Sequence, residues 1–145
     1  MNKDIREVKK VVSSIHMGNL LFRNYINRTK DEKLKKELIQ ILERFESHVD
    51  YFKSLTKKYD LKNVEKLNFG QEMVLSVQLM KHHKNDFGII QEALRGLNMG
   101  TLGMLDFVYN NPDMYKDIKD YAMVVLKDYD ILQERLHKFS LETYC

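Results

Sequence analysis

Residues that interrupt regular structure are scarce in this chain. It has one proline and six glycines among 145 residues, and it contains no tryptophan. Lysine, glutamate, leucine and methionine are frequent, and all four favour helices. The scarcity of breakers and this composition together predict a protein built from long α-helices.

Cysteine and long apolar runs are also nearly absent. Cys145 is the single cysteine, so no disulfide can form within the chain, which is typical of a reducing compartment. The first residues, MNKDIREVKKVV, are charged and lack the apolar run of a signal peptide. No stretch reaches the ~18 consecutive apolar residues of a membrane helix. We therefore expect a cytoplasmic protein with no membrane partner.

Charge is weak overall and unevenly distributed. The net charge is +3, which is too small to imply a nucleic-acid partner. Residues 1–62 hold 15 Lys and Arg against 9 Asp and Glu, whereas residues 63–145 hold 9 against 12. A basic half and an acidic half can pair within one molecule or between two copies, so internal pairing and a homodimer both remain open.

Apolar residues recur every three or four positions in four segments, the pattern of amphipathic helices. These segments cover about residues 3–27, 30–58, 85–109 and 111–138. The connection 59–69 loses this pattern, and a shorter helix is predicted over 71–83. Two tight links and one long middle connection predict an all-α four-helix bundle that forms a single domain, residues 1–145.

Capping residues indicate where three of the helices begin. Thr29 and Glu32 have the spacing of a capping box, in which the Thr29 hydroxyl accepts the amide of Glu32. Asn85, followed by Asp86, is a predicted cap of the next long helix. In the string NNPD, an asparagine is expected as the cap, with Pro112 at the first helical position and Asp113 in the first turn of the last helix.

The chain also contains an internal repeat. Residues 15–20 (IHMGNL) and 97–102 (LNMGTL) share a pattern, which predicts two helical hairpins related by an approximate twofold axis. Gly18 and Gly100 occupy equivalent places inside helices, where glycine costs about 1 kcal/mol relative to alanine. Close approach of a neighbouring helix would explain both glycines, and so would a ligand against the backbone.

Five strings carry a family resemblance: HMGNLLFRNYINR, LKKELIQILERFESHVDYF, QEMVLSV, ALRGLNMGTL and NNPD…YDILQERL. In this order they resemble a bacterial family of ferritin-like four-helix-bundle proteins of unknown function, over about residues 8–139. The chain is more distantly similar to spore coat F-like bundles. The resemblance implies an up-down-down-up bundle whose long middle crossover carries the short extra helix.

Ferritin-like proteins with two metal ions place Glu on the first and third helices and Glu-x-x-His on the second and fourth. The resemblance maps these ligand positions to Ile15, Phe45, His48, Leu97, Tyr129 and Leu132. Only His48 is a metal ligand, so we expect a degenerate site with no di-metal centre and no cofactor.

Several polar residues remain as candidates. His48 and Tyr129 are predicted to hydrogen-bond, directly or through one water, near the bundle centre; alternatively His48 lies at the edge of the apolar stripe and reaches solvent. The pair His82–His83 with Asp86 either binds a metal or forms a solvated helix end. A solvated face is expected at Glu43, Glu46 and Asp50, and Cys145 is either an inert tail thiol or a link between copies.

These observations predict a non-enzymatic, metal-free structural or protein-interaction module. Its partner would be another copy or a larger assembly, and the coat-like resemblance suggests a sporulation or stress role by analogy. Leu20, Leu21 and Tyr25 lie off the main stripe of the first helix and must be covered, either by a partner or by the short middle helix. One alternative is a metal-binding or oxidoreductase bundle with a displaced or incomplete site. Another is a small-ligand binder with a cavity beside Gly18 and Gly100.

Overall fold

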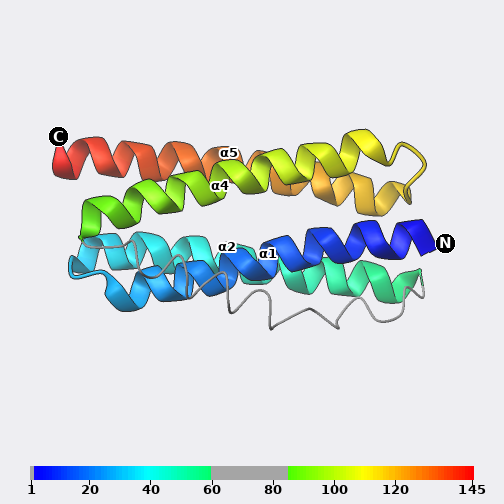
Figure 1. Ribbon diagram of the computed structural model, residues 1–145, viewed down its shortest axis with the longest axis horizontal. Helices are drawn as coiled ribbons and strands as arrows, with labels where there is room; N and C mark the ends of the chain where they lie inside the picture. Colours follow the sequence, from blue (N-terminus) through cyan, green and yellow to red (C-terminus); the bar gives the residue numbers. More distant parts are fainter. Residues whose placement is uncertain (1, 60–84) are drawn as a thin grey trace.

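The computed structural model describes residues 2–59 and 85–145, and all regular structure in these two ranges is helical. Four helices pack side by side (Figure 1): α1 (Asn2–Arg28), α2 (Glu32–Lys58), α4 (Asp86–Asn110) and α5 (Lys116–Tyr144). This confirms the predicted all-α class. The short helix predicted over 71–83, like most of the middle connection, lies outside the described residues.

The four helices form two hairpins that pack against each other. Helix α1 packs on α2 and α4 packs on α5, while α1 with α4 and α2 with α5 join the hairpins. Figure 1 shows α1 and α5 running one way along the long axis and α2 and α4 running the other way. None of these described helices is long and apolar enough to cross a membrane.

Hydrogen bonds connect the hairpins at one end of the bundle. Asp86, in the first turn of α4, accepts the backbone amides of Lys30 and Asp31 at 3.0 and 2.9 Å. The Tyr144 hydroxyl, at the end of α5, donates to the carboxylate of Asp31 at 3.1 Å. The starts of α2 and α4 therefore lie together with the end of α5.

Of the two predicted caps of α2 and α4, the structure replaces the first and confirms the second. The cap of α2 is Asp31, whose side chain accepts the amide of Lys33 at 2.9 Å. The predicted capping box is wrong because the Thr29 hydroxyl donates backwards, to the carbonyl of Tyr25 at 2.6 Å. The predicted cap of α4 is confirmed: the Asn85 side chain accepts the amide of Gly88 at 2.7 Å.

The start predicted for the last helix is also wrong. Helix α5 begins at Lys116, and Pro112 lies in the connection before it. The reason is that Asn111 caps the preceding helix, because its side-chain amide donates to the carbonyl of Phe107 at 2.8 Å. At its other end α5 extends to Tyr144, six residues beyond the predicted end at 138.

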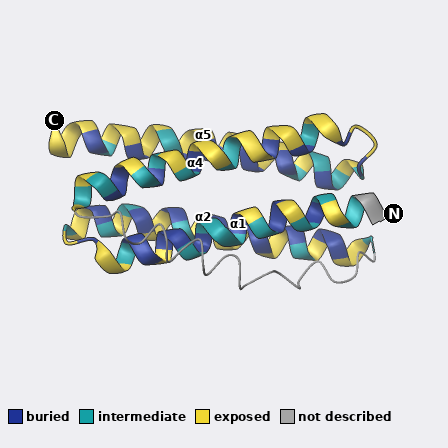
Figure 2. Cartoon of the chain, in the orientation of Figure 1, coloured by how far each residue is buried: buried dark blue, intermediate teal, exposed yellow. Residues whose placement is uncertain are grey.

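Figure 2 shows exposed residues on the outer faces of both hairpins. The exposed large apolar residues, in contrast, are unevenly divided between the hairpins. Among the described residues, α1 exposes no large apolar side chain, and α2 exposes those of Ile39 and Tyr51. On α4 and α5 the exposed large apolar residues are Phe87, Met99, Leu102, Leu105, Tyr109, Met123, Val124, Ile131, Leu141 and Tyr144. The second hairpin therefore carries most of the exposed apolar surface.

The contact surface expected on α1 is largely closed. Tyr25 is buried and packs edge-on against Phe22 with ring centroids 5.3 Å apart, Leu21 is buried as well, and Leu20 is only partly exposed. The apolar residues off the main stripe of α1 therefore belong to the interior.

Candidate functional site

The six positions that the family resemblance assigns to metal ligands all lie in the interior. Ile15, Phe45, His48, Leu97, Tyr129 and Leu132 are each exposed by 4% or less. Phe45 meets Tyr129 edge-on at 5.7 Å between ring centroids and meets Phe22 at 5.0 Å. Apolar and aromatic side chains therefore fill the space where carboxylates would hold two metal ions. These residues do not fit a di-metal centre.

The two repeat glycines make room for aromatic rings of this layer. A Cβ atom on Gly18 would lie 3.4 Å from the ring of Phe45, and one on Gly100 would lie 3.0 Å from the ring of Tyr129. In each hairpin the first helix thus provides the glycine and the second helix the ring. The repeat predicted close approach of a neighbouring helix at both glycines. In the structure, an aromatic side chain of that helix packs against each glycine.

His48 is the centre of a buried polar network between α2 and α5. Its Nε2 lies 2.6 Å from the carboxylate of Asp128, and its Nδ1 lies 2.7 Å from the hydroxyl of Tyr121. With Asp128 ionised, the Nε2–H of a neutral imidazole donates to the carboxylate, and Nδ1 accepts from Tyr121. Both ring nitrogens are therefore engaged by protein groups.

Arg44 completes the network at the surface. Its Nη2 and Nε donate to the two oxygens of Asp128 at 2.6 and 3.1 Å, a bidentate ion pair. Burial alone would raise the pKa of Asp128, but the hydrogen bonds from Arg44 and His48 outweigh it and lower that pKa. Asp128 is 4% exposed, so the network keeps a charged carboxylate inside the bundle.

Burial also shifts the pKa values of the other members of the network. Burial lowers the pKa of His48 below 6.5, because it disfavours the imidazolium more than Asp128 favours it. Burial, together with the charge of Asp128, raises the pKa of Tyr121 to about 12. At neutral pH the network thus holds a neutral imidazole and a protonated phenol, and it joins α2 to α5 as a polar clasp.

The predicted partner of His48 is wrong. Tyr129 lies beside the His48 ring with centroids 6.3 Å apart, but both ring nitrogens bond Tyr121 and Asp128 instead. The alternative, a solvent-exposed His48, is also wrong because the residue is 4% exposed. Helical spacing contained the missing signal: Arg44 and His48 are four residues apart, and Tyr121 and Asp128 are seven apart, so each pair shares a helix face.

Ion pairs join the basic and acidic halves of the chain within the molecule. Besides Arg44 with Asp128, Lys58 of α2 pairs with Asp117 of α5. One pair has the opposite polarity, Arg135 of α5 with Glu37 of α2 at 2.9 Å. Internal pairing, one of the two predicted options, is therefore present along the contact between α2 and α5.

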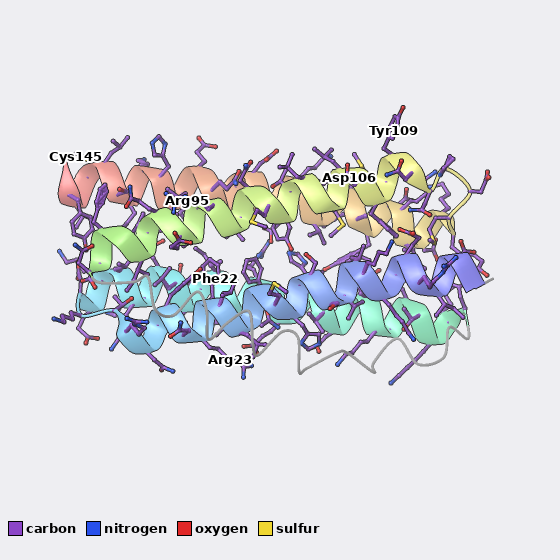
Figure 3. All side chains as sticks on the ribbon, in the orientation of Figure 1. Phe22, Arg23, Arg95, Asp106, Tyr109 and Cys145 are labelled. Atoms are coloured by element: carbon purple, nitrogen blue, oxygen red, sulfur yellow. The ribbon has the colours of Figure 1, made fainter. Side chains whose placement is uncertain are left out.

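The remaining sequence candidates are scattered. Glu43, Glu46 and Asp50 are exposed, and Glu46 pairs loosely with Arg23 at 3.4 Å. Within the described residues no group of three or more His, Cys, Asp or Glu side chains is placed to hold a metal ion. His82 and His83 lie outside those residues. Cys145 is an exposed free thiol directly after the last turn of α5 (Figure 3).

A cleft with a volume of about 640 Å³ lies beside the second repeat glycine. It is lined by residues of α1 and α4, including Ser14, Gly100 and Phe107, and by Tyr129 of α5. Tyr129 is 4% exposed, and its hydroxyl has no hydrogen-bond partner among the described residues. The cavity predicted beside the glycines is thus found at Gly100, whereas the ring of Phe45 covers Gly18.

Comparison of the chain with models of known protein families, with curated proteins and with solved structures found no match.

Proposed function

We propose that this chain is a degenerate ferritin-like bundle that acts by contact with other proteins, in the cytoplasm, and not as an enzyme. The helix directions support this proposal, because α1 and α5 run opposite to α2 and α4, as an up-down-down-up bundle requires. A long connection joins α2 to α4, which is where that fold has its crossover.

The observation that carries the proposal is the chemistry of the bundle centre. Phe22, Phe45 and Tyr129 pack there edge-to-face, and His48 has both ring nitrogens hydrogen-bonded. A buried ring with satisfied nitrogens stabilises the fold, whereas a metal ligand or general base needs a free lone pair. What such a bundle offers to its surroundings is its surface, and α4 and α5 provide exposed apolar side chains. A role in sporulation or stress follows by analogy with coat-like bundles.

Metal analysis of the untagged protein tests this proposal. We expect iron, manganese and zinc far below one equivalent per chain after purification without chelators. A stoichiometric, tightly bound metal would overturn it and favour the displaced-site alternative. If a metal is found, His48→Gln would show where it binds. Loss of the metal in this variant would place the metal at the network around His48.

One observation favours a second candidate function, the binding of a small amphipathic molecule. The cleft between α1 and α4 has the size of common ligand pockets, and Tyr129, whose hydroxyl has no hydrogen-bond partner among the described residues, lies on its lining. Titration with the fluorescent probe 8-anilinonaphthalene-1-sulfonate tests it. Saturable binding that Ser14→Phe abolishes by filling the cleft would support this function, and equal binding by both proteins would contradict it.

A further inference from the structure

Helix α4 carries a stripe of apolar side chains on its outer face. Met99 is exposed by 70%, Leu102 by 54%, Leu105 by 49% and Tyr109 by 84%. Figure 3 shows Tyr109 projecting from α4 away from α1 and α2. Contiguous exposed apolar surface of this kind marks a contact site for another macromolecule.

Three of these residues, Met99, Leu102 and Tyr109, have the spacing of a helix–helix seam. Positions 92, 95, 99, 102, 106 and 109 alternate steps of three and four residues, which keeps them on one line along the helix. Met99 and Leu102 form the middle of this line, and charged residues, Arg95 and Asp106, flank them on either side. The seam is therefore apolar at its centre. Along the helix, a positive charge precedes this centre and a negative charge follows it.

We propose that this seam binds α4 of a second copy of the chain, antiparallel, about a twofold axis that passes between Gly100 and Thr101. Each seam residue then faces the residue equally far beyond the axis. Met99 faces Leu102 of the second copy, and Arg95 faces Asp106 of the second copy. Because the axis is twofold, every contact is made twice. This inference rests on the proposed interaction function and names the partner.

The charges select the partner and its direction. Arg95 is exposed and pairs only within its own helix, with Glu92, and Asp106 has no ion-pair partner among the described residues. A parallel pairing would place Arg95 against Arg95 and Asp106 against Asp106. The antiparallel pairing brings opposite charges together at both flanks, so the surface is complementary to itself.

Glycines leave space for this contact. An added Cβ on Gly96 or Gly103 would meet no atom within 4 Å, so the space next to both positions is open. Gly96 and Gly103 are seven residues apart and lie on the same flank of α4, so in the antiparallel register Gly96 of one copy lies near Gly103 of the other. Small residues thus meet along this flank, which lets the helices approach closely.

Sedimentation velocity over a concentration series tests the proposal. A single helix pair buries less than the ~800 Å² per partner of a standard interface, so we expect a monomer–dimer equilibrium in the micromolar range. Leu102→Asp should remove the dimer. The matched control is Ile131→Asp, which places the same charge on the exposed surface of α5, outside the seam, and should leave dimerisation unchanged.

Charge reversal tests the register itself. Arg95→Asp and Asp106→Arg should each raise the dimer Kd at least about tenfold, because like charges then meet twice. The double variant Arg95→Asp/Asp106→Arg should regain dimerisation close to that of the unaltered chain. Circular dichroism checks that each variant keeps its helices.

Three results would overturn the proposal: a chain that stays monomeric at several hundred micromolar, a dimer that survives Leu102→Asp, or a double variant no tighter than the single ones. A dimer that survives Leu102→Asp but is lost in Ile131→Asp would refute the α4 seam and leave the proposed interaction function standing. Failure of that function is measured separately, by a bound metal.

Discussion

The α1–α2 hairpin and the α4–α5 hairpin share one internal arrangement. Gly18 of the first lies under the ring of Phe45, and Gly100 of the second lies under the ring of Tyr129. The outer surfaces differ, because most exposed large apolar residues belong to α4 and α5. Packing at the centre constrains both hairpins in the same way, whereas the outer faces are free to differ. A surface specialised for contact can therefore lie on one hairpin only.

The largest expected effect concerns the polar contact between the hairpins. Asp128→Ala removes the acceptor of both Arg44 and His48, leaving a buried imidazole N–H without a partner. We expect the free energy of unfolding to fall by about 2–4 kcal/mol. Chemical denaturation followed by circular dichroism at pH 7.5 measures it.

The control for this change lies in the same interface. Asp117→Ala removes an exposed ion pair with Lys58 at the end of α2, so it should leave the free energy of unfolding close to that of the unaltered protein. Equal losses in both variants would show that the buried network contributes no more than a surface ion pair does.

A pair of glycine substitutions compares the hairpins directly. Gly100→Ala places a Cβ 3.0 Å from the ring of Tyr129, closer than ordinary van der Waals contact, and that ring also packs edge-on against Phe45 and His48. We expect a loss of about 1–2 kcal/mol, since overpacking exceeds the gain in helix propensity. Gly18→Ala meets Phe45 at 3.4 Å and should be neutral or stabilising by up to about 1 kcal/mol.

Thermal or chemical denaturation of the two single variants gives the comparison. Identical changes in both would mean that the two hairpins tolerate a methyl group equally, and the difference between the two ring contacts would have no energetic consequence.

The smallest expected effect is a pH dependence that originates at His48. Its folded-state pKa is lowered below 6.5. As the pH falls through 6.5, the imidazole therefore binds a proton in the unfolded chain before it does so in the folded chain. The contribution of neutral His48 to stability is fully present above pH 6.5 and is lost as the pH falls from 6.5 towards the folded-state pKa. The slope is at most about 1.4 kcal/mol per pH unit.

Denaturation at pH 7.5 and pH 5.5 tests this prediction, with His48→Gln as the comparison. The lowered pKa of Asp128 keeps its carboxylate charged over that range. The unaltered protein should lose more stability than His48→Gln between the two pH values, and parallel losses would assign the dependence to other groups.

Much of the architecture could be predicted from the sequence, because apolar spacing and a few caps define long helices. The four helices and the cap at Asn85 follow from such local patterns. The start of α5 could not be predicted locally, since Asn111 had two helices available to cap and caps the preceding one. Whether such a residue caps the preceding or the following helix depends on which helix end lies closer to its side chain.

The candidate site was only partly predictable for a related reason. His48 stood out as the one remaining metal-type ligand, but its partners, Tyr121 and Asp128, lie on another helix. Helical spacing shows that Tyr121 and Asp128 share a face, and it does not show the rotation of α5 against α2. That rotation decides that Tyr121, and not Tyr129, bonds the imidazole.

Asp86 makes two backbone amides sensitive to the docking of the two hairpins. Its carboxylate accepts the amides of Lys30 and Asp31, which precede α2 and are outside its repeating backbone pattern. Formation of the first hairpin by itself would leave both N–H groups open to water. Their deuterium uptake therefore reports whether the two hairpins have docked, independently of whether the helices of each hairpin have already formed.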